Sequence, residues 1–239
     1  MVNAAEKDLI DRYQRLTERL RQAESHYGRA EGSVCLVAVS KTYPADHVRM
    51  VATQGQRDFG ENQIQDAMTK IPVLEDVGCS WHFIGPIQSN KCRDIAFRFD
   101  WVHSIDRAKV ARRLSDMRPA DAEPINMLIQ VNLQNEATKS GVLPKQLGAL
   151  VEEVKNLPNL KLRGLMAIPA PETLFDRQRA TFARLRELLQ ATNREHQTNM
   201  DCLSMGMTDD LEAAVAEGAT HVRVGTAIFG PRQKPASNP

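Results

Sequence analysis

Short apolar segments recur along the chain and alternate with amphipathic ones. The first apolar segment covers residues 34–40, and the later ones cover 57–59, 80–84, 100–104, 125–133, 160–168, 202–205 and 221–224. A short apolar run that ends at polar or turn residues is typical of a strand buried on both faces of a parallel sheet. The pattern therefore predicts eight strands.

The segments between these strands carry apolar residues at helical spacing. They predict a short helix after Asn90 and longer helices at about 45–54, 61–71, 106–117, 144–156, 173–192 and 209–217. A further amphipathic helix at 3–27 precedes the first strand, and its apolar positions are Ile10, Tyr13, Leu16 and Leu20. Eight βα units within about 200 residues favour a closed barrel over an open sheet. We therefore predict an α/β fold, a single (β/α)₈ TIM-barrel domain spanning residues 1–239 with an extra N-terminal helix.

Charge and cysteine usage exclude several classes of protein. The 31 basic and 30 acidic residues are interspersed and leave a net charge of +1, which argues against a nucleic-acid binder or an anionic-membrane binder. No apolar run reaches the length of a membrane span, and the N-terminus lacks the features of a signal peptide, so we expect a cytoplasmic protein. The cysteines show no C-x-x-C or zinc-ligand spacing, so we expect reduced thiols and no metal site: Cys35, Cys79, Cys92 and Cys202.

Lys41 stands directly after the first apolar strand, in the segment Ser40-Lys41-Thr42. Parallel strands end at the face where α/β proteins build their sites. A lysine there is either a surface cation or an amine held in a pocket. Burial lowers the pKa of an amine from about 10.4, and such an amine can form a Schiff base with a carbonyl compound such as pyridoxal phosphate. Position alone leaves both interpretations open.

The turns after the last two strands pair glycines with hydroxyl residues. Ser204 and Gly206 follow the seventh strand, and Gly225-Thr226 follows the eighth. Barrels frequently bind phosphate at these two loops, where backbone amides approach an anion closely. Each turn alone is equally compatible with an ordinary strand-to-helix connection, but the two together favour a phosphate site.

A helix start is predicted at Asp209, because Glu212 three residues later completes a capping-box pattern. Asp209 and Asp210 would repel an anion at that helix end. The predicted phosphate site therefore depends on the turns themselves and not on this helix.

Arg223 interrupts the apolar eighth strand, and alternation places it on the opposite face from its valine neighbours, so it could point into the barrel mouth. A buried arginine needs a carboxylate or an acceptor on a ligand. Other strand-end polar residues would converge on the same face, as a small-molecule site requires: Glu61, Asn62, His82 and His103. For either histidine alone, a hydrogen-bonded core residue is the simpler interpretation.

Six sequence blocks together resemble one family. They are V-A-V-S-K-T (37–42), F-G-E-N (59–62), W-H-F-I-G-P-I-Q-S-N-K (81–91), G-L-M-A-I (164–168), S-M-G-M-T-D-D (204–210) and V-R-V-G-T-A-I-F-G (222–230). In this order they closely resemble the pyridoxal phosphate homeostasis proteins, a single-domain fold-type III family similar to the barrel domain of alanine racemase. Thr208 stands where relatives often carry serine, and the hydroxyl is kept.

The resemblance implies a role for each matching residue. Lys41 would hold pyridoxal phosphate as a Schiff base, and Arg223 would meet the pyridine nitrogen. Ser204 and the Gly225-Thr226 turn would bind the phosphate. The remaining matching positions would line the pocket: Asn62, Met166 and Met205.

The expected function is to hold the cofactor with little turnover. An arginine against the pyridine nitrogen disfavours its protonation and weakens the cofactor as an electron sink. A racemase also needs a second acid/base, which alanine racemase takes from its partner's C-terminal domain, and we expect no such domain so soon after Thr226. We therefore predict a monomer that buffers pyridoxal phosphate or delivers it to apoenzymes that require it, and that limits its free aldehyde.

Two other functions stay open on sequence grounds. One is a small racemase-like enzyme, and the other is a binder of phosphate ligands without a Schiff base. Lys139, in the loop after the fifth strand, could assist release of the cofactor, although a solvated surface lysine is the simpler interpretation.

Overall fold

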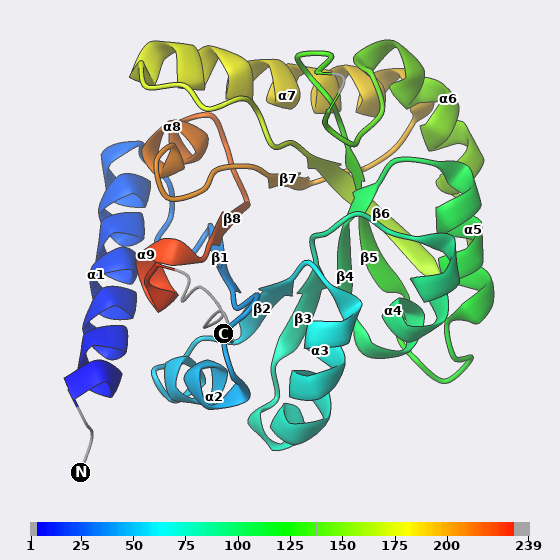
Figure 1. Cartoon of the computed structure of the whole chain (residues 1–239). Coiled ribbons are helices and arrows are strands. Elements are labelled where there is room, and N and C mark those ends of the chain that lie inside the picture. Colours follow the sequence, from blue (N-terminus) through cyan, green and yellow to red (C-terminus); the bar gives the residue numbers. More distant parts are fainter. Residues whose placement is uncertain (1–3, 137, 232–239) are drawn as a thin grey trace.

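Eight parallel strands close into a barrel surrounded by helices (Figure 1). The computed structural model describes residues 4–136 and 138–231. The strands follow one another around the barrel, and the last pairs with the first: β1 Cys35–Val39, β2 Asp58–Glu61, β3 Ser80–Phe83, β4 Trp101–Ile105, β5 Ile125–Gln130, β6 Leu160–Met166, β7 Cys202–Ser204 and β8 His221–Val224. The predicted (β/α)₈ barrel is confirmed.

The helices cover the outside of the barrel. They are α1 Ala4–His26, α2 Ala45–Thr53, α3 Ile64–Lys70, α4 Cys92–Arg98, α5 Ala108–Met117, α6 Pro144–Val154, α7 Phe175–His196, α8 Leu211–Ala216 and α9 Thr226–Phe229, with 3-10 helices η1 Ile71–Val77 and η2 Ser89–Lys91. None of the helices within the described ranges is long and apolar enough to cross a membrane.

The additional N-terminal helix is confirmed as α1, which packs against α2, α8 and α9 (Figure 1). Its buried apolar positions include Tyr13, Leu16 and Leu20 as predicted, and Leu9 takes the place expected for Ile10. This helix precedes the βα repeat, and it lies beside α8 and α9, the last two helices of the barrel.

The strands divide their side chains between two environments, as period-2 alternation requires. Leu36 and Ala38 belong to the large apolar cluster shared with the helices. The barrel interior contains a small apolar cluster of Leu128, Met166 and Cys202. Buried polar residues lie in the interior as well, and they include His82, His103, Ser204 and Arg223.

Some element boundaries differ from the predicted ones. β5 ends at Gln130 and not at 133, because the returning loop takes the next backbone groups: Val142 N donates to Gln130 O and Asn132 N donates to Val142 O. The strand predicted at 57–59 continues through Glu61. Apolarity alone could not place these ends, because hydrogen bonding to neighbouring segments decides them.

The predicted helix start at Asp209 is wrong, since α8 begins at Leu211. Glu212 does not complete a capping box, because its carboxylate pairs with Arg19 of α1 at 2.5 Å. The Asp210 carboxylate instead accepts the backbone N–H of Met207 at 2.6 Å. Contacts with a distant helix outweighed the local capping pattern.

Candidate functional site

Lys41 lies in a tight turn at the carboxyl end of β1, half-buried at the barrel mouth. The residue after it, Thr42, has φ of 69°, a left-handed conformation that is unusual for a β-branched side chain. The Thr42 N–H donates to the Asp66 carboxylate of α3 at 2.8 Å. α3 therefore holds the backbone on the C-terminal side of Lys41.

A buried ionic cluster holds the backbone on the other side. We call it the Lys70 network, and it consists of Ser40, Glu61, Asp66 and Lys70. The Lys70 ammonium donates to Ser40 O at 2.7 Å, to Glu61 Oε1 at 2.8 Å and to Asp66 Oδ2 at 2.9 Å. The Ser40 hydroxyl also donates to Glu61 Oε1 at 2.6 Å. Because Lys70 and Glu61 are almost fully buried, the network fixes the position from which the Lys41 side chain starts.

The two carboxylates of this network respond differently to burial. Burial raises the pKa of Glu61 to about 7, against the opposing effects of Lys70 and Ser40. Glu61 Oε2 is buried and has no hydrogen-bond partner among the described residues. For Asp66, burial also raises the pKa, but hydrogen bonds from Lys70 and Thr42 outweigh it and the net shift is downward.

The turn after β8 lies beside β1. The two strands pair in register, with Val37 opposite Arg223. A Cβ atom on Gly225 would lie 3.0 Å from the carbonyl oxygen of Val39, so a side chain there would crowd β1. Gly225 is half-buried, and Thr226 opens α9 with its side chain exposed. The structure thus brings this turn next to the strand that carries Lys41.

Arg223 points into the barrel, as predicted, but none of the carboxylates among the described residues forms an ion pair with it. Its guanidinium donates to Ser204 Oγ at 2.7 Å and to the carbonyl oxygen of Ala167 at 2.9 Å. Burial lowers the pKa of Arg223 to about 10. Ser204 is fully buried, and its hydroxyl also contacts His103 Nδ1 at 2.8 Å. The hydroxyl of Ser204 is therefore engaged inside the barrel.

The other residues expected in the pocket occupy different layers. Met166 lies in the barrel interior with Leu128, whereas Met205 belongs to the outer apolar cluster. Gly206 adopts φ of 92°, and a Cβ there would lie 2.5 Å from Ala214 Cβ of α8. Its carbonyl accepts the Arg223 N–H at 3.0 Å. The Met205 side chain thus packs in the large apolar cluster and not with Met166 in the interior.

Two histidines continue the polar interior below Ser204. His103 Nε2 lies 2.9 Å from His82 Nδ1, and His82 Nε2 lies 3.0 Å from the Asp58 carboxylate. Both histidines are fully buried, which confirms the interpretation as hydrogen-bonded core residues. Burial, followed by the charges of His82, His221 and Arg223, holds the pKa of His103 well below its usual value.

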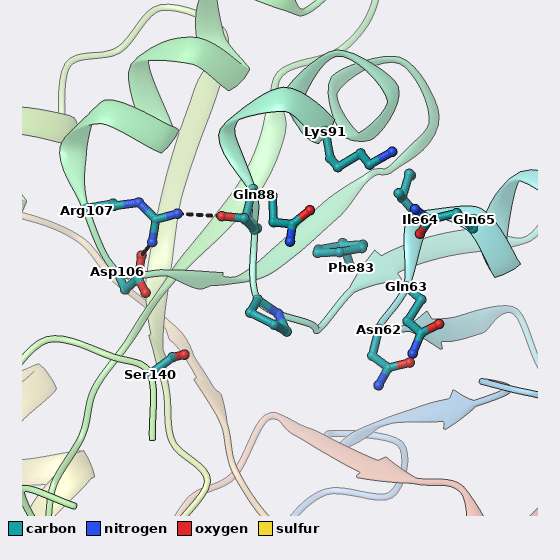
Figure 2. Close-up of a pocket in the computed structure, with 12 residues that line it drawn as sticks. Asn62, Gln63, Ile64, Gln65, Phe83, Gln88, Lys91, Asp106, Arg107 and Ser140 are labelled. Carbon is teal, nitrogen blue, oxygen red and sulfur yellow. Dashed lines mark hydrogen bonds and ion pairs between the residues drawn. The ribbon is translucent and has the colours of Figure 1, made fainter. Parts of the chain in front are cut away.

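A cavity of about 430 Å³ opens beside the ends of β2, β3 and β4 (Figure 2). Asn62 lies on one side of it and Arg107 on the other, with Lys91 and Gln88 between them. Of the nine residues expected at the site, Asn62 alone lines this cavity. Lys139 pairs with Glu136 at 2.7 Å in the loop after β5.

The sequence analysis did not predict Lys70 and Asp58 as residues of the site. Lys70 had one local signal, the spacing of four residues from Asp66 on a predicted helix. Asp58 had another, because it begins a strand whose inward positions it shares with Gly60. Neither signal identifies a partner on a different strand.

Comparison with known proteins supports the resemblance seen in the sequence. Residues 12–233 match the family described as alanine racemase, N-terminal domain. A Pseudomonas aeruginosa protein named pyridoxal phosphate homeostasis protein is 56% identical over 218 residues, which are 91% of this chain and 93% of that protein. The chain belongs to the pyridoxal phosphate homeostasis protein family. The Escherichia coli K12 member is 45% identical over 228 residues, 94% of this chain and 97% of that protein.

Solved structures agree with this membership. PipY of Synechococcus elongatus with pyridoxal phosphate bound is 36% identical, with a TM-score of 0.79, and the match covers 88% of this chain and 100% of PipY. Alanine racemase of Corynebacterium glutamicum is 21% identical with a TM-score of 0.66, and the match covers 96% of this chain and 63% of the racemase. The racemase shares the fold of this family member.

Proposed function

We propose that this chain binds pyridoxal phosphate and takes part in its homeostasis. The observation that carries the proposal is the juxtaposition of Lys41 with the Gly225-Thr226 turn at one barrel mouth, above the inward-facing Arg223. The names of the relatives and the ligand bound to PipY support the same assignment.

The types of these residues and their positions at the barrel mouth suit pyridoxal phosphate. Bound pyridoxal phosphate supplies an aldehyde carbon that an amine can hold as a Schiff base. Lys41 would provide that amine, and Arg223 would donate to the ring nitrogen. Gly225, where a Cβ would crowd Val39, and Thr226 would offer backbone N–H groups and a hydroxyl to the phosphate.

The remaining predicted residues would act around this centre. Asn62 and Met166 would line the pocket, and Gly206 and Met205 would contribute backbone groups beside it. Ser204 was expected to bind the phosphate, but its hydroxyl already contacts the guanidinium and His103, so we propose that this hydroxyl acts through Arg223. Each of these roles is a proposal for this chain.

Little catalytic turnover is part of the proposal. Arg223 has only donors to offer, so it would keep the ring nitrogen unprotonated and the cofactor a weak electron sink. Incubation of the loaded protein with amino acids, followed by chiral chromatography, tests this point. Racemisation at enzyme-like rates would support the racemase alternative.

Covalent binding at Lys41 is tested by borohydride reduction and peptide mapping of the protein incubated with pyridoxal phosphate. We expect the reduced adduct on Lys41 and its loss in Lys41→Ala, with Lys139→Ala as the control that retains it. An adduct on another lysine would contradict the site. Undiminished binding by Lys41→Ala without an adduct would support the phosphate-binding alternative.

We further propose that the protein acts as a cytoplasmic monomer that passes the cofactor to apoenzymes. Light scattering of the purified protein measures its mass in solution. Mixing the loaded protein with an apoenzyme that requires pyridoxal phosphate tests transfer, and activation faster than free dissociation of the cofactor would support direct delivery.

A further inference from the structure

A continuous chain of hydrogen bonds crosses the barrel interior from the start of β2 to Arg223. It connects one residue from each of five strands, namely Asp58, His82, His103, Ser204 and Arg223. Its successive contacts measure 3.0, 2.9, 2.8 and 2.7 Å. Asp58 keeps 33% of its side chain exposed at the amino-terminal end of the barrel, whereas the two histidines and Ser204 are fully buried.

The residues at the two ends of this series determine which atom donates and which accepts in each of its hydrogen bonds. A guanidinium can only donate and an ionised carboxylate can only accept. Asp58 is ionised at neutral pH, because burial raises its pKa but the hydrogen bond from His82 helps to outweigh that effect, and the net shift is downward. Arg223 therefore donates to Ser204 at one end, and His82 Nε2 donates to Asp58 at the other.

The interior contacts follow from these ends. Arg223 donates to the Ser204 oxygen, so the Ser204 hydroxyl donates to His103 Nδ1. His103 then donates from Nε2 to His82 Nδ1, and His82 donates from Nε2 to Asp58, so each imidazole carries one proton, on Nε2. The reverse direction would leave the Ser204 hydrogen without an acceptor in the chain.

The aromatic side chains around this series of hydrogen bonds favour a fixed arrangement of its residues. Trp101 stacks on His82 with ring centroids 5.5 Å apart. The ring centroids of His221 and His103 lie 5.8 Å apart, but His221 Nδ1 contacts the Thr220 hydroxyl and takes no part in this series of hydrogen bonds. In a buried interior hydrogen bonds strengthen one another, and leaving one unmade is costly.

We propose that His82, His103 and Ser204 are positioning residues that form a one-directional relay from Arg223 to Asp58. We call it the Asp58–Arg223 relay. It holds the Ser204 oxygen toward Arg223, and the Ala167 carbonyl fixes the second guanidinium nitrogen. The guanidinium thus presents its remaining N–H groups in one orientation. The identity of the ligand that receives them rests on the proposed function.

The first test uses the protein without cofactor. Nitrogen-15 NMR of the histidine side chains reports which ring nitrogen carries the proton. We expect neutral Nε2–H forms for both His82 and His103 at pH 7. A charged His103, or an Nδ1–H form of either residue, would overturn the relay whether or not the protein binds pyridoxal phosphate.

The second test compares variants with a matched buried histidine. Ser204→Ala and His103→Phe should weaken pyridoxal phosphate binding about tenfold or more and shift the absorption band of the bound cofactor. His221→Phe, outside the relay, should change binding by less than about twofold. Equal effects of Ser204→Ala and His221→Phe would contradict the relay.

The two proposals fail in distinguishable ways. Wild-type protein that does not bind pyridoxal phosphate would refute the proposed function and leave the NMR result to decide the relay. Wild-type binding with an unchanged constant in Ser204→Ala would refute the relay alone. If His103→Phe does not fold, Ser204→Ala still decides, because it removes only one hydroxyl.

Discussion

Two buried hydrogen-bond systems hold the two cationic residues of the candidate site, and they do so by different means. The Lys70 network lies between the barrel and α3 and binds the backbone on both sides of Lys41. The Asp58–Arg223 relay lies inside the barrel and binds the Arg223 guanidinium itself. The Lys70 network fixes the backbone from which the flexible Lys41 side chain extends. The Asp58–Arg223 relay fixes the planar guanidinium group of Arg223.

The difference is visible in the carboxylates. Glu61 of the Lys70 network is fully buried, and its pKa is raised to about 7 by burial. Asp58 of the relay is partly exposed; burial raises its pKa, but the hydrogen bond from His82 helps to outweigh that effect and the net shift is downward. The two systems should therefore respond in opposite ways to pH.

The largest effect is expected from Lys70→Met, which removes the ammonium that contacts Glu61, Asp66 and Ser40 O. An uncompensated buried carboxylate remains, so the free energy of unfolding should fall by about 3–5 kcal/mol at neutral pH. Urea denaturation measures it. Lys145→Met, at an exposed position of α6, serves as the control and should change stability by about 0.5 kcal/mol or less.

A double variant separates the missing partner from lost packing. Lys70→Met with Glu61→Leu removes both charges, so it should regain much of the stability that Lys70→Met loses. Stability that stays at the level of Lys70→Met would indicate that the lysine stem, and not its charge, stabilises this region.

The next effect concerns pH and Glu61. Its folded pKa of about 7 lies above the ordinary 4.5, so folding favours the protonated carboxyl. This contribution is fully present below pH 4.5 and is lost as the pH rises through 7, with a change of at most about 3 kcal/mol. Denaturation of Glu61→Gln across this interval should lack the decline. An identical slope in wild type and variant would refute the assignment.

The ionised Asp58 carboxylate should stabilise the fold at high pH and not at low pH, the opposite of Glu61. Asp58→Asn should change the free energy of unfolding by less than the Glu61 variant does. The pKa of Asp58 lies below its ordinary 3.8, so its contribution is present above that pH and is lost as the pH falls below it. The variant keeps an acceptor for His82 but loses the charge. We expect a loss of about 1 kcal/mol at pH 7 that disappears in acid, measured by denaturation at both pH values.

The sequence predicted the barrel because its evidence is repetitive, with eight apolar segments separated by helical ones. It also predicted that Arg223 points inward, since alternation along a strand needs no knowledge of neighbours. The partners of Arg223 could not be derived in this way. Ser204 and Ala167 come from other strands, and the register between strands decides which polar groups meet.

The Lys70 network shows the same limit more strongly. The sequence places Glu61 at a strand end, but Lys70 resembles any polar residue at the end of a helix. Its burial follows from the packing of α3 against β2 and from its contacts with Ser40 and Glu61, which no local pattern encodes. The cap predicted at Asp209 failed for a related reason, because Arg19 of α1 pairs with Glu212.

The smallest effect is expected at the turn itself. Thr42 has φ of 69°, a conformation that costs a β-branched residue about 1–2 kcal/mol and glycine almost nothing. Thr42→Gly should stabilise the protein by up to about 1 kcal/mol, since the greater freedom of glycine in the unfolded chain offsets part of the relief. Asn135→Gly, at φ of 54°, is the matched control and should gain less, because asparagine tolerates this region. A larger gain at Asn135 than at Thr42 would show that the turn beside Lys41 is not strained.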